Sequence, residues 1–360
     1  MTQATLWQRC VSLFSRQAGN PGANLLSPDD LYAALERERL RADRTGSTFA
    51  VVSFSPVWDQ VREATAAELA RILRPRLRGS DQAGLMADGR VGLLLPDTPA
   101  AGARTLADGV LAQWTAAVPA PVPEIYVYPS DVKWWERLER IRAAAGIVPE
   151  AQPAARLLLK PMPRWKRALD VAGAGLGLLL LSPMLAVVAA AIKLSSPGPV
   201  FFKQRRAGRG GVPFWMYKFR SMVADAESQQ TALRALNERD GPTFKIERDP
   251  RVTRLGRFLR ATNIDELPQL WNVFQGDMSL VGPRPLPCDE SDACTGWQRR
   301  RLDVTPGLTC IWQAHAHRAK VSFVEWVRMD LRYIKSLSLK LDLRLILHTL
   351  KLTCGRKAGK

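Results

Sequence analysis

The sequence has few of the side chains that bind transition metals or form disulfides. Its five cysteines are odd in number and form no C-x-x-C pair, which excludes a disulfide framework and a cysteine-based zinc site. We therefore expect reduced thiols on the cytoplasmic side of the membrane. His315 and His317 lie two residues apart with no third ligand in view, a spacing more typical of a solvated loop than of a metal site. The cysteines are Cys10, Cys288, Cys294, Cys310 and Cys354.

The chain also lacks an apolar N-terminus and an excess of acid. Its start, MTQATLWQRCVSLFSRQ, is too polar for a signal peptide, and a short amphipathic helix is expected over 1–18. Residues 1–150 carry 17 basic and 17 acidic side chains, so the other 35 basic and 17 acidic ones supply the whole net charge of +18. A length of 360 residues predicts two domains, and the basic one should meet nucleic acid, anionic lipid or phosphorylated substrates.

Alternating apolar patterns predict a compact N-terminal domain over 1–145. Two strands surround an Asp88-Gly89 turn within 82–96, and two further strands are expected over 47–55 and 123–129. The order β-α-β-β-α-β is that of a ferredoxin-like sandwich. Four prolines predict a linker over 146–163. Helices are expected over 28–43, 60–76, 99–117 and 131–144.

The stretches ALERERLRADRTGSTFAVVSFS and ADGRVGLLLPDTPAAGARTLADGVLAQW resemble the GGDEF diguanylate cyclase family in pattern. The hairpin reads MADGRV, so the catalytic motif is missing, and the first strand ends in Ser53 and Ser55 where that family places a metal-binding aspartate. The resemblance implies a degenerate, nucleotide-cyclase-like domain. Ligand binding, regulation or pairing into a homodimer is then expected of it rather than catalysis.

Residues 171–192, VAGAGLGLLLLSPMLAVVAAAI, contain no charge. As a helix, 22 residues extend about 33 Å, enough to reach across a hydrocarbon core. A buried core helix and a nucleotide-binding glycine loop are the alternatives, and the length of the run disfavours both. Ser182-Pro183 lies at its centre, and both flanks are basic. Because positive flanks favour the cytoplasmic side, we expect a re-entrant membrane helix over 166–194, with a kinked single span as the alternative.

The stretch NIDELPQLWN places Asp265 and Glu266 side by side. One interpretation is structural: Asn263 and Glu266 have the spacing of a capping box, and a helix follows that Gly276 ends. The other interpretation is a reaction centre, because cations surround the pair in the sequence. Arginines recur every third residue up to Arg260, two predicted strands carry Lys218 and Arg220, and prolines flank Arg284 in GPRP.

Four stretches resemble the bacterial sugar transferases, the monotopic polyprenyl-phosphate phosphoglycosyl transferases that initiate exopolysaccharide and O-antigen synthesis. They are KRALDVAGAGLGLLLLSPMLAVVAAAIKLSSPGPVFFKQRRAGRGGVPFWMYKFRSM, DPRVTRLGRFLRATNIDELPQLWNVFQGDMSLVGPRP, TPGLTCIWQ and MDLRYIKSLSLKLDLRLILHTL. The resemblance covers about 164–352 and favours the catalytic interpretation of the carboxylate pair.

The resemblance implies an undecaprenyl-phosphate sugar phosphotransferase. Asp265 would attack a UDP-sugar, release UMP and carry the phosphosugar until polyprenyl phosphate accepts it. Glu266 would assist, Mg²⁺ would bind Asp265 and Glu266, and Ser182-Pro183 would break the re-entrant helix. The phosphate-binding or substrate-binding residues would be Lys218, Arg220, Arg260, Arg284 and Arg318. Cys310 and His317 depart from the family pattern by replacing glycines, and Asp330, Tyr333 and Asp342 match it, through structure more than chemistry.

We therefore predict an α+β protein with an N-terminal sandwich and a mainly helical, membrane-associated catalytic domain over 164–355 that contains a small β element. Its expected location is the bacterial inner membrane, monotopic, with the catalytic domain on the cytoplasmic face and in contact with membrane lipid. The alternative is a non-enzymatic membrane adaptor with a nucleotide-sensing N-terminal domain. Nucleic acid is not expected as a partner, because the long uncharged run and the lack of a binding motif argue against it.

Overall fold

The computed structural model describes residues 25–57, 62–115, 117–129, 152–153, 157–159, 162–229, 231–315 and 321–355. It divides the chain into two compact units, 1–158 and 159–360, at a point inside the expected linker. The helices expected over 1–18 and 131–144 lie outside the described residues.

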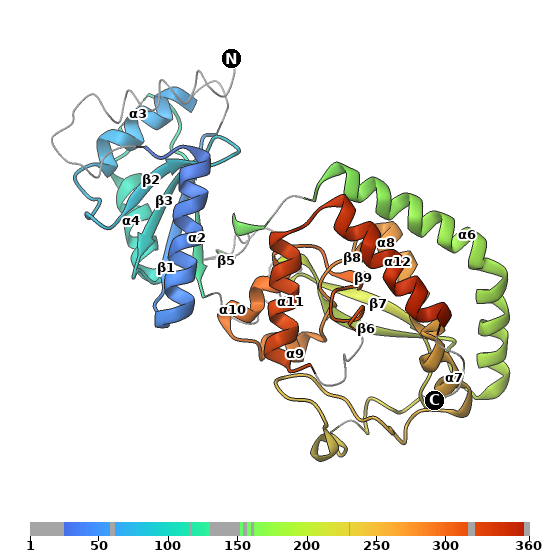
Figure 1. Cartoon of the computed structure of the whole chain (residues 1–360). Helices are drawn as coiled ribbons and strands as arrows, with labels where there is room; N and C mark the ends of the chain where they lie inside the picture. Colours follow the sequence, from blue (N-terminus) through green and yellow to red (C-terminus); the bar gives the residue numbers. More distant parts are fainter. Residues whose placement is uncertain are drawn as a thin grey trace. The chain divides into compact units, whose positions relative to one another are not determined.

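The first unit is built on one five-stranded sheet with the order β2-β3-β1-β4-β5 (Figure 1). Its neighbours are antiparallel except for β4 and β5, and β1 pairs with both β3 and β4. The predicted β-α-β-β-α-β order is present. The elements are α2 (Pro28–Thr45), β1 (Phe49–Ser55), α3 (Arg62–Leu73), β2 (Gln82–Leu85), β3 (Val91–Pro96), α4 (Ala100–Ala112), β4 (Val122–Tyr128) and β5 (Gln152–Pro153).

Residue alternation along β1 explains the layers of this unit. Val52 and Phe54 belong to a core with α3 and α4, whereas Phe49 and Val51 belong to a second core with α2. Because successive side chains of a strand point to opposite faces, an all-apolar strand must be covered on both sides. The helices accordingly lie on both faces of the sheet.

The second unit has two small sheets among its helices. A hairpin joins β6 to β7 through the expected glycine-rich turn, where Gly210 and Gly211 have positive φ, and β8 pairs in parallel with β9. Its elements are α6 (Arg164–Ser195), β6 (Phe201–Ala207), β7 (Pro213–Phe219), α7 (Arg254–Thr262), α8 (Gln269–Gln275), β8 (Ser279–Val281), α9 (Cys288–Asp292), α10 (Gly296–Arg299), β9 (Gly307–Thr309), α11 (Phe323–Lys335) and α12 (Leu339–Gly355).

Helix α6 contains the uncharged run and bends near its middle (Figure 1). Pro183 lies inside the helix and has no N–H to donate to the carbonyl of Leu179, four residues earlier. The Ser182 hydroxyl donates to that carbonyl instead, at 2.8 Å. The helix is therefore continuous through the bend, and the proline leaves no unpaired carbonyl on its apolar surface.

Both ends of α6 pack on the same unit. Near its start, Ala174 shares a core with Leu270 and Val273 of α8, and near its end Ile192 packs with Phe219 and Leu259. Between these ends one side of the helix packs partly against the same two cores, through residues such as Leu181 and Leu185, and the other side is exposed. By length and composition it could cross a membrane.

The glycines of α6 serve packing and not a nucleotide loop. A Cβ on Gly173 would lie 2.7 Å from Leu280, and one on Gly177 would lie 3.2 Å from Leu270. Small residues there allow α8 and β8 to approach the helix backbone closely.

Candidate functional site

The carboxylate pair lies in a short 3-10 turn and not in the first turn of a helix. Thr253 caps the start of α7, and Asn263 ends it in the left-handed conformation with φ 56°. The turn Ile264–Glu266 follows, and α8 begins only at Gln269, after Pro268. Asn263 stands at the N-cap position of this turn, but its side chain makes no capping hydrogen bond, so the expected capping box with Glu266 is absent. The expected stop at Gly276 is confirmed, with φ 103°.

Glu266 is held between two cations that come from different elements. Lys218 of β7 donates to Glu266 Oε1 at 2.7 Å. Arg284, in the loop after β8, donates from Nη1 to Oε2 at 3.2 Å and from Nη2 to Oε1. Although burial alone would raise it, Arg284 and Lys218 hold the pKa of the Glu266 carboxyl well below its usual range. Glu266 is therefore a fixed anion that holds two cations in place.

Asp265 is buried, with 7% of its surface exposed. Within the described part of the chain, its carboxylate makes no hydrogen bond and no ion pair. Burial raises the pKa of Asp265 to about 6, against the opposing charges of Lys218, Arg260 and Arg284. A buried carboxylate without a partner is costly to fold and marks a functional site more often than a structural one.

Backbone contacts fix the Arg284 loop. A Cβ on Gly307 would lie 2.0 Å from the backbone nitrogen of Gly282, so the chain segments cross at a distance that only glycine permits. Gly307 N–H also donates to Pro283 O at 2.9 Å. In the amide orientation that satisfies its neighbours, Gln313 accepts from Arg284 Nη1 at 2.5 Å and donates to Leu308 O at 3.1 Å. The guanidinium is thus held by Glu266 and Gln313 together.

A buried ion pair supports the same loop from behind and was not identified from the sequence. Arg301 donates to Asp330 at 2.6 Å and to the carbonyl of Arg284 at 2.8 Å. Both side chains are almost fully buried. Arg301 stands in an unremarkable QRRR run, and nothing in the sequence distinguishes it from its neighbours. Asp330 acts through structure, as expected.

The remaining predicted cations have different surroundings. The Nε of Arg260 donates to Ser221 Oγ at 2.9 Å, and this residue lines the same cavity as Asp265. Arg220 donates to the carbonyls of Pro197 and Ser196 at 2.8 Å each, just beyond the end of α6. These are the contacts of a helix cap, and the phosphate-binding role of Arg220 stays a prediction. Arg318, and His317 beside it, lie outside the described residues.

The basic flank before the membrane run is also used internally. Lys166 is buried and donates to Asp342 at 2.6 Å, to Tyr333 Oη at 3.0 Å and to Val281 O at 2.8 Å. Arg167 donates to the last carbonyls of α8, those of Val273 and Phe274. The two side chains therefore join the start of α6 to the rest of the second unit instead of reaching toward lipid.

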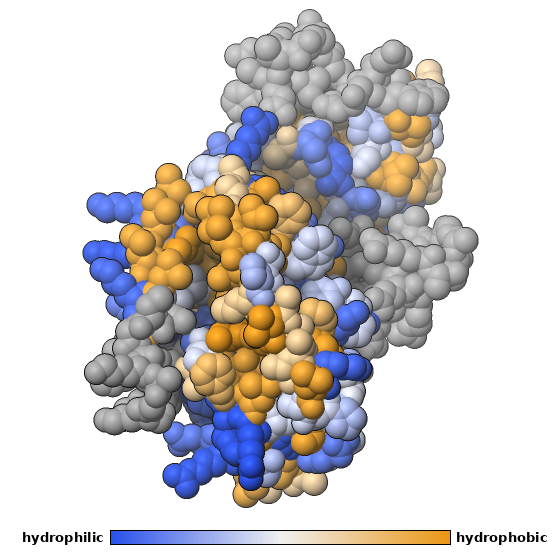
Figure 2. Space-filling view, turned by 90° about the vertical axis from the view of Figure 1, so that its right-hand side faces the viewer, coloured by the Kyte–Doolittle hydropathy of each residue, from blue (hydrophilic) through white to orange (hydrophobic). Residues whose placement is uncertain are grey.

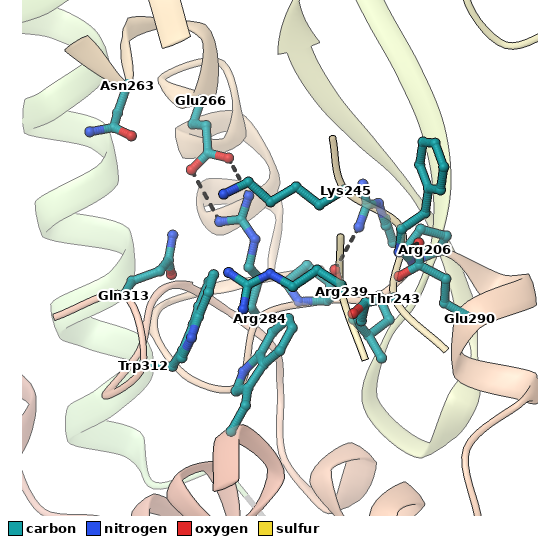
Figure 3. A pocket seen from close by; sticks show the side chains of 15 residues that line it. Arg206, Arg239, Thr243, Lys245, Asn263, Glu266, Arg284, Glu290, Trp312 and Gln313 are labelled. Carbon is teal, nitrogen blue, oxygen red and sulfur yellow. Dashed lines mark hydrogen bonds and ion pairs between the residues drawn. The ribbon is translucent and has the colours of Figure 1, made fainter. Parts of the chain in front are cut away.

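Two cavities meet at Glu266 and Arg284. The larger, of about 850 Å³, is lined by Asp265, Arg260, Lys218 and residues after α6 such as Phe201. The smaller, of about 310 Å³, is lined by Trp312, Gln313 and other polar residues but not by Asp265. Figure 3 shows the smaller one, with Glu266 joined to Arg284 by dashed lines. Both are lined as well by Arg206 and Glu290.

Apolar side chains gather on the outside of α6. Figure 2 views the molecule from the side on which Figure 1 draws this helix, and orange residues dominate much of that face. Helix α12 adds leucines four or three residues apart on one helical stripe. The exposed apolar residues are Leu176, Leu179, Leu180, Val187 and Leu194 of α6, Trp271 and Phe274 of α8, and Leu339, Leu343, Leu347 and Leu350 of α12.

Residues 162–356 match the family model described as bacterial sugar transferase. The galactosyl transferase CpsE of Streptococcus agalactiae is 45% identical over 186 residues, which are 52% of this chain and 41% of that protein. The UDP-glucose:undecaprenyl-phosphate glucose-1-phosphate transferase of Caulobacter vibrioides is 43% identical over 203 residues, 52% of this chain and 71% of its own length. The exopolysaccharide production protein ExoY of Rhizobium meliloti is 38% identical, over 52% of this chain and 85% of that protein.

The N-terminal unit is similar to a solved GGDEF domain from Pseudomonas aeruginosa, at 22% identity and a TM-score of 0.25, over 29% of this chain and 77% of that one. A similarity this slight supports no conclusion about the unit, and its cyclase-like character stays a prediction.

Proposed function

Since the chain belongs to the bacterial sugar transferase family, we propose that it transfers a sugar 1-phosphate from a UDP-sugar to polyprenyl (undecaprenyl) phosphate and releases UMP. This would be the first membrane step of polysaccharide synthesis. The observation that carries the proposal is the contrast within the pair: Glu266 is clamped by two cations, whereas Asp265 has no partner among the described residues and lines a large cavity.

Asp265 is the proposed nucleophile. Its carboxylate oxygen attacks the β-phosphorus of the UDP-sugar, a bond forms from that oxygen to phosphorus, and the bond between this phosphorus and the oxygen of UMP breaks. A phosphate oxygen of polyprenyl phosphate then attacks the same phosphorus and regenerates the carboxylate. With a pKa of about 6, Asp265 is mostly ionised at neutral pH.

The cations counter the repulsion between this anion and the anionic substrates. Lys218, Arg284 and Arg260 all act electrostatically on Asp265. Positioned charges at low dielectric stabilise a phosphoryl-transfer transition state without reorganising. Glu266 fixes Lys218 and Arg284 in advance, which is a supporting role and not a second nucleophile.

Magnesium fits this site through Asp265. Mg²⁺ is commonly held by one or two carboxylates together with substrate phosphates, and Asp265 has oxygens to which no group of the described residues bonds. Both Glu266 oxygens are taken by Lys218 and Arg284, so Glu266 could bind a metal only by exchanging them. Among the described residues, no three His, Cys, Asp or Glu side chains form a metal-binding group. When bound, the ion would neutralise charge on the diphosphate.

We propose that α6 enters the inner membrane from the cytoplasmic face and returns to it. Its two ends pack on one unit, while its middle exposes apolar side chains. A helix of 32 residues is about 48 Å long, so a straight span would carry one end away from that unit. The exposed stripe of α12 fits a helix lying in the interface beside it.

The reaction is tested by incubating the protein in detergent or nanodiscs with UDP-sugars, Mg²⁺ and undecaprenyl phosphate while UMP is measured. Without acceptor, intact-protein mass spectrometry should find one phosphosugar bound to wild type and none to Asp265→Asn. No UMP from any common UDP-sugar would refute the reaction, and a bound phosphosugar on the variant would refute the role of Asp265.

Topology is tested separately by labelling single cysteines placed at 162 and 200 in intact inverted vesicles. The proposal expects both to be labelled from the same side, and labelling from opposite sides would establish a span.

A further inference from the structure

The smaller cavity has no assigned role in the reaction. It shares Glu266, Arg284 and Glu290 with the larger one but does not reach Asp265. The two cavities therefore adjoin, with eight lining residues in common, and only the larger one reaches the proposed nucleophile. A further inference about their use rests on the proposed transferase function.

The two-step chemistry gives the cavities different requirements. UMP must leave before polyprenyl phosphate attacks the same phosphorus, so one space exchanges its occupant during each turnover. The sugar stays attached to the phosphorus through both steps. It therefore needs a space that keeps the same occupant until the second step is complete. The larger cavity is lined by Pro199 and Phe201, which directly follow the membrane helix, and this is where a lipid substrate would arrive. The smaller cavity then remains for the sugar.

The lining of the smaller cavity matches a ring that carries hydroxyl groups. Thr243 and Glu290 supply a hydroxyl and a carboxylate, groups that hydrogen-bond to sugar hydroxyls, whereas the amide of Gln313 is already used by Arg284 and Leu308. Trp312 is stacked on Trp326 with ring centroids 4.5 Å apart, and the guanidinium of Arg239 lies 5.6 Å from its ring centre. Because protein groups already cover that ring, the cavity is not a slot for a stacked uracil base.

Glu290 stands out among these residues. One of its oxygens accepts from the backbone N–H of Phe244 at 3.2 Å, and the other makes no hydrogen bond within the described residues. Burial raises the pKa of Glu290 to about 7, although the nearby Arg206 opposes this. Figure 3 shows Glu290 and Arg206 on one side of the cavity, Gln313 and Trp312 on the other, and Glu266 at its edge.

We propose that the smaller cavity holds the sugar of the UDP-sugar donor and that Glu290 selects the donor by hydrogen bonding to a sugar hydroxyl. A sugar whose hydroxyl is inverted or replaced leaves this half-buried carboxylate unpaired, and a polar group of the site that is left without its partner is a basis for rejection.

The test compares kcat/KM for UDP-glucose, UDP-galactose and UDP-N-acetylglucosamine in wild type and Glu290→Gln. The variant is expected to change the ratio between the best donor and the others by about 10-fold or more, as for the loss of one hydrogen bond to a charged group. Glu290 also lines the larger cavity. The KM for undecaprenyl phosphate and the inhibition constant of UMP should nevertheless change less than about twofold, because the proposal gives the hydrogen bond of Glu290 to the sugar and not to either of these ligands.

Asp289→Asn is the matched control. Asp289 is the neighbouring carboxylate on α9, is exposed, and lines neither cavity. It should leave the donor ratios unchanged. If Glu290→Gln does not fold, Glu290→Asp keeps the charge, withdraws it from the cavity and should change the ratios in the same assay.

Three results would overturn the inference. An equal loss with every donor would make Glu290 a structural residue. A weaker UMP inhibition with unchanged donor ratios would place the nucleotide, and not the sugar, against Glu290. If wild type releases no UMP from any donor, the transferase function itself fails, and the sugar site fails with it.

Discussion

Both units contain a cluster of charged side chains around one arginine or carboxylate pair, but the two clusters differ in how completely they are paired. In the first unit Arg90 bonds to Asp88 at 2.7 Å, to Glu124 and to Ser53 at 3.1 Å, and Tyr126 in turn donates to Glu124. In the second unit Glu266 is paired in the same way, yet Asp265 beside it is not. A fully paired cluster stabilises a fold, whereas an unpaired charge beside a cavity is available to a substrate.

The largest expected effect comes from the unpaired carboxylate. Asp265→Asn should lower UMP release by about 10³-fold or more, because the amide cannot form the phosphosugar bond. The thermal unfolding temperature in detergent should stay the same or rise, since a buried unpaired charge is removed. Glu124→Gln, a comparable carboxylate in the first unit, is the control and should retain near-wild-type UMP release.

The paired half of the site should respond in both activity and stability. Lys218→Met leaves the buried carboxylate of Glu266 with one cation fewer, which should reduce kcat/KM by about 10²-fold and the free energy of unfolding by about 3 kcal/mol. The double variant Lys218→Met/Glu266→Gln should lose less stability than the sum of the losses of the two single variants. Strict additivity in this double-mutant cycle would show that the ion pair at 2.7 Å is not formed in solution.

The paired cluster of the first unit should affect stability alone. Arg90→Met leaves Glu124 and Asp88 without their cation and should lower the unfolding temperature of this unit, at a cost of about 1–2 kcal/mol. Transferase activity is expected to stay within about twofold of wild type. A loss of kcat/KM beyond 10-fold would show that this cluster takes part in the reaction or its regulation, and the contrast between the units would no longer hold.

The smallest effect is expected from the bend of α6. Ser182→Ala leaves the carbonyl of Leu179 without a donor and should cost about 1 kcal/mol of stability in detergent. Ser195→Ala is the matched control, because the Ser195 hydroxyl also donates to the carbonyl three residues earlier, that of Ile192. That carbonyl lies at the end of the helix and has a second donor, Arg220, so it keeps a partner in the variant. Equal effects of the two substitutions would remove any special role for Ser182.

The sequence predicted the elements better than the partners of their charged side chains. Apolar alternation located β1, the β2–β3 hairpin and β4 to within two residues, and the GPRP motif singled out Arg284 as a phosphate ligand but did not predict its contact with Glu266. The same reasoning could not foresee that Arg220 caps α6 or that Lys166 is buried. An arginine or lysine in a basic run has many possible acceptors, and the choice depends on which carbonyls the tertiary fold brings within reach.

The capping interpretation of Asn263 failed for a related reason. The spacing to Glu266 suited a capping box, but the side chain of Glu266 is taken by Lys218 and Arg284, and Asn263 instead ends the preceding helix. Glu290 was missed because an acidic residue in CDESD has no periodic or motif context. Its importance becomes visible only when α9 is placed against the cavity.

The Lys166–Asp342 pair also has a consequence for the order in which this protein can be made. The residues are 176 positions apart, so Lys166 at the start of α6 meets its partner only after α12 has left the ribosome. Until then the ammonium group of Lys166 has no buried acceptor from α12 and must stay in contact with water. The apolar segment of α6 is therefore complete early in synthesis, but its base is locked last, by the final helix of the described chain.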